Sequence, residues 1–242
     1  MFRLSNPHLR PAPRDFRFIT VIGNVGAGKS TLTRALSEAM NFDASFESVA
    51  NNPYLSDFYQ DQAAWGFHLQ IYFLGQRYKD IVDIAQARRH HIQDRSIYED
   101  VEIFATALYE SGKMTQRDFE TYRTLFYNMV EQLIKPDLAI YLTGSLDTIL
   151  ERIHLRGREA EKAVPTSYWA ELHRRYDDFI SRYDHSPLLS VDIDRFDIFK
   201  HPEHLDELVV EIQKFLHVEP GRALWGPTLD PRHTRRAAAG GE

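Results

Sequence analysis

Short apolar runs alternate along the chain with longer stretches in which apolar residues recur every three or four positions. The short runs are rich in β-branched and aromatic residues, which is typical of buried strands, and the longer ones are typical of amphipathic helices. Strands are predicted at residues 16–22, 44–49, 91–92, 138–142 and 188–193. Helices are predicted at residues 31–40, 59–89, 99–109, 114–135, 145–155, 167–183 and 205–216. This alternation favours an α/β fold with a five-stranded parallel sheet flanked by helices.

The composition describes a chain that can bury a core and has no thiol chemistry. It has 242 residues, of which 43% are hydrophobic, and no cysteine. Disulfides, thiolate zinc sites and cysteine nucleophiles are therefore excluded, and we expect a cytoplasmic protein. The 35 acidic and 29 basic residues give a formal charge of -6, which disfavours a nucleic-acid binder. No apolar run approaches the roughly 20 residues of a membrane helix, so no membrane partner is expected.

The two ends of the chain differ in composition from the middle. The first acidic residue is Asp15, and prolines are frequent before it, so residues 1–15 are predicted to be a flexible extension. An organelle-targeting remnant is the alternative for this acid-poor start. Residues 218–242, rich in Pro, Gly, Ala and Arg, are predicted to be a disordered tail. Residues 16–217 show neither a repeat nor a linker and are expected to form one domain.

A glycine-rich segment joins the first predicted strand to the first predicted helix. It fits the pattern G-x-x-x-x-G-K-[ST] in full, and the strand and helix that such a loop requires lie on either side. Its N–H groups would surround phosphates, its lysine would reach the β- and γ-phosphates, and its serine would bind Mg²⁺. The chain is therefore predicted to bind ATP, with Mg²⁺ as cofactor. The predicted ATP-binding residues here are Gly23, Asn24, Val25, Gly26, Ala27, Gly28, Lys29, Ser30 and Thr31.

Three classes of protein use such a loop: small-molecule kinases, GTPase switches and ATPases that act on a partner. A GTPase typically carries Asn-Lys-x-Asp and Asp-x-x-Gly, and neither tetrapeptide occurs in this chain. There is also no apolar strand that ends in two acids, which many ATPases use to hold Mg²⁺. The kinase class fits the sequence best.

Further motifs follow the glycine-rich loop. Phe-Glu-Ser-Val at 46–49 ends a predicted strand, where a carboxylate faces the loop and can accept a proton or help hold Mg²⁺. The segment 65–70 places a glutamine, whose amide suits a nucleobase edge, among aromatic residues. Asp-Arg-Ser at 94–96 ends another strand, and 152–158 gathers arginines that match phosphate oxygens. Together these motifs resemble the deoxyribonucleoside kinase family over residues 16–216.

The resemblance implies the groups that act on the transferring phosphoryl group. Glu47 is implied to be the general base for the nucleoside 5′-hydroxyl, with a second role beside Mg²⁺. The family usually has Glu-Pro-Val, and Ser48 in place of proline loosens the turn but leaves the carboxylate. Asp94 is implied to bind Mg²⁺, and Arg95 to lie close to the 5′-hydroxyl and to Glu47. Lys29 completes the implied catalytic set.

The resemblance also implies which residues bind the nucleoside. Gln70 would hydrogen-bond the base, and Phe67 would belong to the aromatic residues that sandwich it. Tyr59 would donate to the sugar 3′-hydroxyl. Arg77 and Asp100 resemble the charged pair that lies near the base edge and influences base choice.

An arginine-rich segment around residues 152–165 resembles the LID that closes over the triphosphate in this family. Arg152, Arg156 and Arg158 would contact the phosphates of ATP, and a glycine within the segment lets it move. Glu161 matches the LID glutamate that contacts the sugar 3′-hydroxyl. One segment would then contact both substrates.

The expected activity is ATP-dependent 5′-phosphorylation of 2′-deoxyribonucleosides in nucleotide salvage. Asn-Pro-Tyr-Leu at 52–55 and Asp-Arg-Ser at 94–96 look most like bacterial members that prefer deoxyadenosine or deoxyguanosine. A pyrimidine-preferring kinase and a nucleoside monophosphate kinase remain alternatives, although the latter needs additional basic residues that are not evident near Gln70. An ATPase module acting on a protein partner is the alternative outside this class. The resemblance also implies a homodimer formed through helices such as 59–89 and 114–135.

Overall fold

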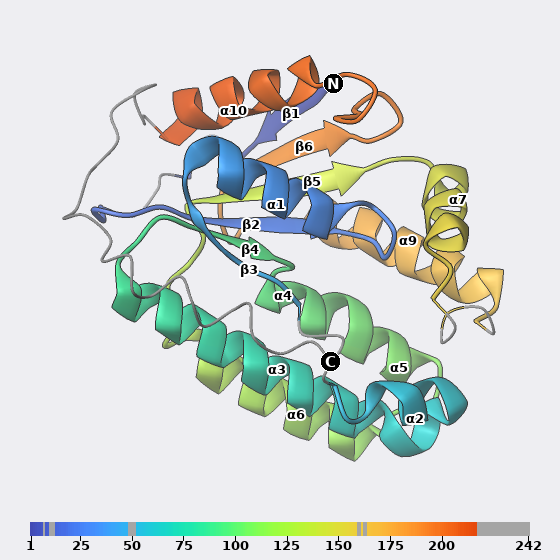
Figure 1. Cartoon of the computed structure of the whole chain (residues 1–242). Coiled ribbons are helices and arrows are strands. Elements are labelled where there is room, and N and C mark those ends of the chain that lie inside the picture. Colours follow the sequence, from blue (N-terminus) through green and yellow to red (C-terminus); the bar gives the residue numbers. More distant parts are fainter. Residues whose placement is uncertain (7, 10–12, 48–51, 159–160, 162–163, 217–242) are drawn as a thin grey trace, which may run out of the picture.

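The described residues of the computed structural model form a six-stranded sheet with helices packed around it (Figure 1). The structure describes residues 1–242 except 7, 10–12, 48–51, 159–160, 162–163 and 217–242. The strands are β1 (Phe2–Ser5), β2 (Phe18–Gly23), β3 (Asp43–Ser45), β4 (His91–Asp94), β5 (Leu138–Thr143) and β6 (Leu188–Asp192). Their order in the sheet is β1-β6-β5-β2-β4-β3, and only β1 runs antiparallel to its neighbour.

The helices lie in groups on the sides of this sheet. In Figure 1, α1 and α10 lie close together on one side, while α3, α6 and the α4–α5 segment lie on the other. None of the described helices is long and apolar enough to cross a membrane. The helices are α1 (Lys29–Met40), α2 (Leu55–Gln60), α3 (Gln62–Ala87), α4 (Ile97–Glu99), η1 (Asp100–Ala105), α5 (Thr106–Glu110), α6 (Gln116–Val130), α7 (Leu146–Arg156), α9 (Thr166–Ser181) and α10 (Glu203–Leu216).

The edge strand β1 corrects two predictions made from the sequence. It lies inside the segment expected to be a flexible extension, and it pairs in register with β6 from Phe2 opposite Val191 to Ser5 opposite Leu188. The sheet therefore has six strands rather than five. The four residues of β1, which are half-buried or exposed, are too few to show the alternation of apolar and polar positions that predicts a strand. Their partner strand β6 also lies far away in the sequence. The predicted disordered tail lies outside the described residues.

Two further differences between the predicted and observed helices are local. The helix predicted over 59–89 is divided into α2 and α3, because the Asp61 side chain accepts hydrogen bonds from the N–H groups of Ala63 and Ala64 and so caps α3. The predicted helix 99–109 contains the π-helical segment η1. Such a segment rotates the side chains that follow it and is frequent at functional sites.

The central strands place two chain segments at one edge of the sheet. β2 is buried throughout and pairs in parallel with β4 and β5, with Val21 opposite Asp94 and Gly23 opposite Leu142. The carboxyl ends of parallel strands meet at the same edge, where open α/β sheets bind their ligands. The glycine-rich loop after β2 and the Asp-Arg-Ser segment after β4 therefore lie side by side.

Candidate active site

The glycine-rich loop curls from β2 into α1 as its sequence predicts. Gly26 and Gly28 have φ angles of 84° and 97°, in the left-handed region that glycine adopts without strain. Lys29 extends back across the loop. Its Nζ donates to the carbonyl oxygens of Gly23 at 2.8 Å and Asn24 at 2.9 Å. The amine is thus held at the mouth of the loop, where a phosphate can replace its backbone partners.

The other loop residues support the turn or line the cavity next to it. Asn24 is buried, and its Oδ1 accepts a hydrogen bond from the Val25 N–H at 2.7 Å. The Val25 and Lys29 side chains line the cavity. Burial of the Lys29 amine, together with the nearby positive charge of Arg95, lowers its pKa to about 8. Thr31 lies in the first turn of α1 with its side chain exposed.

Two of the three predicted metal ligands lie together. The Ser30 hydroxyl donates to Oδ2 of Asp94 at 2.5 Å, so the loop serine and the carboxylate at the end of β4 share one position. The other oxygen of Asp94 is buried and has no hydrogen-bond partner among the described residues. A hydroxyl and a carboxylate with a free oxygen are suitable ligands for Mg²⁺. Glu47, the third predicted ligand, is instead bound to arginines.

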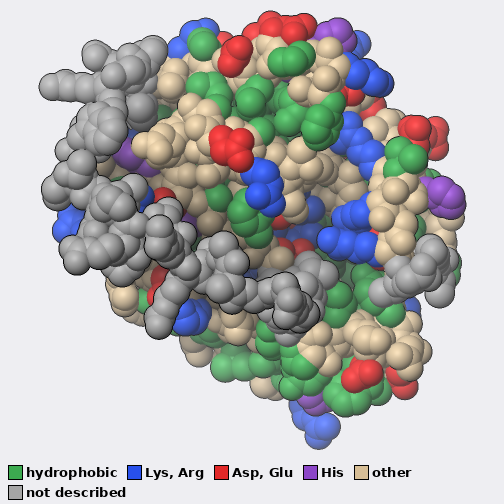
Figure 2. Space-filling view, in the orientation of Figure 1, with side chains coloured by type: hydrophobic (Ala, Val, Ile, Leu, Met, Phe, Trp, Pro, Cys, Tyr) green, Lys and Arg blue, Asp and Glu red, His purple; other side chains and the backbone are tan. Residues whose placement is uncertain are grey.

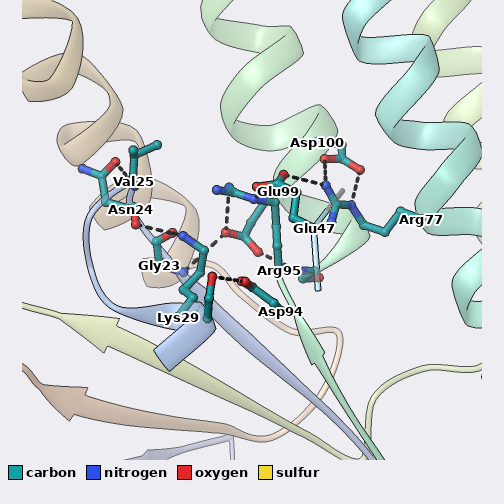
Figure 3. Close-up of polar contacts among 12 residues, drawn as sticks. Gly23, Asn24, Val25, Lys29, Glu47, Arg77, Asp94, Arg95, Glu99 and Asp100 are labelled. Carbon is teal, nitrogen blue, oxygen red and sulfur yellow. Dashed lines mark hydrogen bonds and ion pairs between the residues drawn. The ribbon is translucent and has the colours of Figure 1, made fainter. Parts of the chain in front are cut away.

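Glu47 lies between two guanidinium groups (Figure 3). Its Oε1 is 3.0 Å from Nε of Arg95 and 3.2 Å from a terminal nitrogen of Arg77. Burial alone would raise the pKa of this carboxyl group, but the positive charges of Arg95 and Arg77 oppose it and lower the pKa to about 2. The carboxylate therefore stays ionised at all physiological pH values.

The predicted pair Arg77 and Asp100 is formed and buried. Nε of Arg77 donates to Oδ2 of Asp100 at 2.7 Å, and its terminal nitrogen donates to Oδ1 at 3.0 Å. This two-point geometry fixes the plane of the guanidinium group. Because Asp100 is the first residue of η1 and Arg77 lies on α3, the pair joins these two helices. The same guanidinium also reaches Glu47, so the pair is part of one charged network.

A cavity of about 330 Å³ opens beside this network. Figure 2 shows Lys and Arg side chains gathered around a hollow on this face of the molecule. Its lining combines charged side chains with aromatic and aliphatic ones. Its lining residues include Lys29, Ser30, Glu47, Asp94, Arg95, Asp100, Leu55, Phe58, Tyr59, Leu69, Gln70, Phe73 and Phe104. This mixture suits a ligand with a flat apolar part and a polar reacting group.

Gln70 and Tyr59 lie in the cavity wall as predicted, whereas Phe67 does not. Gln70 is 4% exposed, and its Oε1 has no hydrogen-bond partner among the described residues. Burial and the negative charge of Glu161 raise the pKa of Tyr59 to about 12, so its hydroxyl remains protonated. Phe67 is not among the lining residues and packs partly buried against the core. At about 100° per residue, Phe67 lies outside the arc of α3 that faces the cavity.

The described part of the LID lies over the cavity. Arg156 and Arg158 line it together with Glu161, which accepts two hydrogen bonds of 2.7 Å from Arg156. Arg152 is different: it does not line the cavity but donates to the carbonyl oxygens of Ala27 at 3.0 Å and Ile193 at 3.3 Å. It supports the glycine-rich loop from outside. Residues 159–160 and 162–163 of the LID lie outside the described residues.

Several residues of the site were missed from the sequence alone. Phe73 and Phe104 line the cavity from α3 and η1, and Tyr168 and Trp169 line it from α9. An aromatic residue on a helix is more often part of a core, so sequence gives no sign of this role. Glu99, which contacts Arg95, was also missed, although Ser96-x-x-Glu99 is a visible capping-box pattern.

A second group of potential metal ligands lies away from the cavity and does not suit a metal. One ligand atom each of His201, Glu203 and His204 lies within 4.8 Å of the others. However, Nδ1 of His204 accepts the Asp197 N–H at 3.1 Å, which places the proton of a neutral ring on Nε2. The ring then has no free lone pair for an ion. The group also lies at the N-terminus of α10, whose dipole disfavours cations.

The fold and the site together define a P-loop phosphotransferase: a phosphate loop, a serine–aspartate pair for a metal and a neighbouring cavity with an ionised carboxylate. The family described as deoxynucleoside kinase matches residues 19–217. The chain belongs to this family. It is an enzyme that transfers a phosphoryl group to a nucleoside hydroxyl, which confirms the resemblance noted in the sequence.

Individual relatives cover most of the chain. A deoxyadenosine/deoxycytidine kinase from Bacillus subtilis is 44% identical over 82% of this chain and 93% of its own length. A deoxyadenosine kinase from Dictyostelium discoideum is 40% identical over 88% of this chain and 87% of its own. The structure of a deoxyadenosine kinase from M. mycoides with bound dATP is 30% identical, with a TM-score of 0.73 over 81% of this chain and 99% of its own.

Proposed function

We propose that this protein transfers the γ-phosphoryl group of ATP to the 5′-hydroxyl of 2′-deoxyribonucleosides, with deoxyadenosine as the main substrate. The observation that carries the proposal is the buried Oε1 of Gln70, which has no partner among the described residues. It lies in the wall of the same cavity as Lys29 and Glu47. The names of the Bacillus subtilis and Dictyostelium discoideum relatives support deoxyadenosine.

The amide of Gln70 matches the edge of adenine. Its unpaired Oε1 requires an N–H donor, and adenine offers a 6-amino group beside the acceptor N1. Cytosine offers the same pattern with its 4-amino group and N3, so deoxycytidine is the second candidate, in agreement with the name of the Bacillus subtilis relative. Guanine and thymine present a carbonyl beside an N–H and therefore require the reversed amide.

The residues near the glycine-rich loop have complementary tasks in phosphoryl transfer. Ser30 and Asp94 would hold Mg²⁺, which when bound neutralises charge on the phosphates. Glu47 is ionised and accepts the proton of the 5′-hydroxyl as that oxygen attacks the γ-phosphorus. Arg95 holds Glu47 in place through their 3.0 Å contact. Lys29, Arg156 and Arg158 stabilise the charge on the transferred group.

A panel of the four deoxynucleosides with ATP and Mg²⁺ tests the proposal. We expect deoxyadenosine to give the highest kcat/KM and a 5′-monophosphate product, identified by mass spectrometry and comparison with standards. Gln70→Leu should lower kcat/KM for deoxyadenosine roughly 10- to 100-fold. Gln76→Leu is the matched control, because Gln76 is exposed on the same helix. The proposal fails if no deoxynucleoside is phosphorylated or if thymidine or deoxyguanosine is the best substrate.

We also propose that the enzyme is a homodimer formed through α3 and α6. These helices pack against each other, and α6 carries two large apolar side chains, Leu125 and Tyr127, that are 42% and 45% exposed. A second copy of the chain that packs on the Leu125 side of α6 would bury Leu125, whereas Tyr127, two positions further along, lies on the opposite side of the helix. Light scattering should give twice the chain mass of 28.2 kDa, and Leu125→Glu should shift the mass towards one chain. A monomer at micromolar concentration would contradict the proposal.

A further inference from the structure

Tyr176 contacts Arg95, the arginine at the centre of the charged network, although the two residues lie 81 positions apart in the sequence. Tyr176 lies on α9 and is fully buried. Its hydroxyl donates to Oε1 of Glu99 at 2.7 Å and accepts a hydrogen bond from NH1 of Arg95 at 2.9 Å. Neither Tyr176 nor Glu99 is among the residues that line the cavity, so neither is placed to touch a nucleoside.

Glu99 connects this tyrosine to the glycine-rich loop. The carboxylate is completely buried, and every contact that it makes is internal. Oε2 accepts the Ser96 N–H at 2.6 Å, and Oε1 accepts the Gly23 N–H at 3.4 Å. NH1 of Arg95 lies 3.4 Å from the same Oε1 (Figure 3). The first residue of the phosphate loop and the Arg95 guanidinium group therefore share one anchor.

The backbone of Arg95 needs such an anchor. Its φ angle is 76°, in the left-handed region that residues with a side chain rarely adopt. Its N–H donates to the Val21 carbonyl at 2.9 Å, and its guanidinium group lies 4.7 Å from the centre of the Phe104 ring. A residue held in an unfavourable conformation persists when its surroundings determine its position. Nε of the guanidinium group contacts Glu47, and NH1 contacts Tyr176 and Glu99.

The helix that carries the tyrosine also contributes to the cavity. α9 follows the LID directly, and its first turn places Tyr168 and Trp169 in the cavity wall. Tyr176 lies two turns further along, about 10 Å away. The same helix therefore carries the Tyr176 hydroxyl and two residues of the cavity wall. The LID and Arg95 are thus linked by one element.

We propose that Tyr176 and Glu99 are positioning residues for phosphoryl transfer: they hold the Arg95 guanidinium group against Glu47 and join it to both the glycine-rich loop and α9. This rests on the proposed function, because it assigns Arg95 to the reacting centre. Loss of either group would leave the cavity and its lining intact but would let the guanidinium group move. Misplacement of a positioned group by about 1 Å can reduce turnover about 100-fold.

The test compares Tyr176→Phe with Tyr183→Phe. Both remove a buried phenol hydroxyl, but that of Tyr183 bonds to Ser186 at 2.9 Å, outside the charged network. We expect Tyr176→Phe to lower kcat roughly 10- to 100-fold with less than about a 3-fold change in the deoxynucleoside KM. Tyr183→Phe should leave both constants near the wild-type values. Equal effects of the two variants, or an effect of Tyr176→Phe on KM alone, would overturn the proposal.

A double-mutant cycle shows whether the tyrosine acts through the arginine. In an Arg95→Ala background, Tyr176→Phe should cause no further loss of kcat, because its partner is already absent. Additive losses would contradict a positioning role. If Tyr176→Phe does not fold, as judged by its thermal unfolding, Glu99→Gln is measured in the same cycle and must show the same non-additivity with Arg95→Ala. Failure of the proposed function is distinguishable, because it requires that the wild-type enzyme itself phosphorylates no deoxynucleoside.

Discussion

The position of Glu47 between two guanidinium groups leads to a quantitative prediction for Glu47→Gln. The carboxyl group has a pKa of about 2 in the folded chain, against an ordinary value of 4.5. Burial opposes ionisation, but Arg95 and Arg77 outweigh it. The difference between the two pKa values corresponds to about 3 kcal/mol of stability at pH 7. Glu47→Gln should therefore lower the free energy of unfolding by about that amount.

The pH dependence of this effect follows from the sign of the shift. A group whose pKa is lower in the folded state contributes fully above its unfolded value of 4.5, and the contribution disappears as the pH falls through about 2. The difference between wild type and Glu47→Gln should thus decrease from about 3 kcal/mol at pH 7 to about 1 kcal/mol at pH 3. Urea unfolding followed by circular dichroism measures it. Asp178→Asn is the control, because Asp178 and its partner Arg174 are both exposed, and ion pairs between exposed groups contribute little.

The same substitution tests the catalytic role of the carboxylate. Glutamine keeps the size and one acceptor oxygen but cannot take the proton of the 5′-hydroxyl. We expect kcat to fall at least about 100-fold, with deoxynucleoside affinity nearly unchanged when measured by calorimetry. A pH-independent stability difference would refute the assigned electrostatic environment, and near-normal turnover would refute the assignment of Glu47 as the base.

Three further predictions concern the loop and the buried pair. Gly26→Ala should abolish ATP binding in calorimetry while the chain stays folded, because its φ is 84° and a Cβ there would lie 2.7 Å from a side-chain carbon of α7. ATP binding at pH 8.5 should be accompanied by proton uptake, because Lys29 has a pKa of about 8 and phosphates raise it. The heat of binding should then differ between buffers, and this difference should vanish at pH 6.5; equal heats in all buffers at pH 8.5 would contradict this. Asp100→Ala should cost about 3 to 5 kcal/mol in urea unfolding by leaving Arg77 short of its buried partner, whereas Asp83→Ala, which breaks an exposed pair, should cost much less.

The features that sequence predicts well are those in which one contiguous segment carries the whole signal. The glycine-rich loop carries its turn, its lysine and its serine within eight positions, from Gly23 to Ser30, and the structure shows the turn, with the lysine folded back across it and the serine beside Asp94. Asp94 ends a strand and Arg95 follows it, and the parallel sheet dictates that they meet that loop. The rule that strand ends share one edge supplies the tertiary information that the sequence does not contain.

Contacts between distant segments explain what the sequence could not predict. The Tyr176 hydroxyl lies 81 positions from Arg95 in the chain, and no periodicity distinguishes it from the other aromatic residues of α9. Phe67 and Phe73 are equally aromatic and lie on the same helix, yet only Phe73 lines the cavity, because the packing of α3 decides which arc faces it. Glu99 is intermediate: its capping pattern is visible, but a cap alone does not require complete burial. Burial of a carboxylate costs free energy unless the group is paired and hydrogen-bonded. Besides the cap, Glu99 has partners in an arginine, a tyrosine and the loop, and these additional bonds offset the cost of its complete burial.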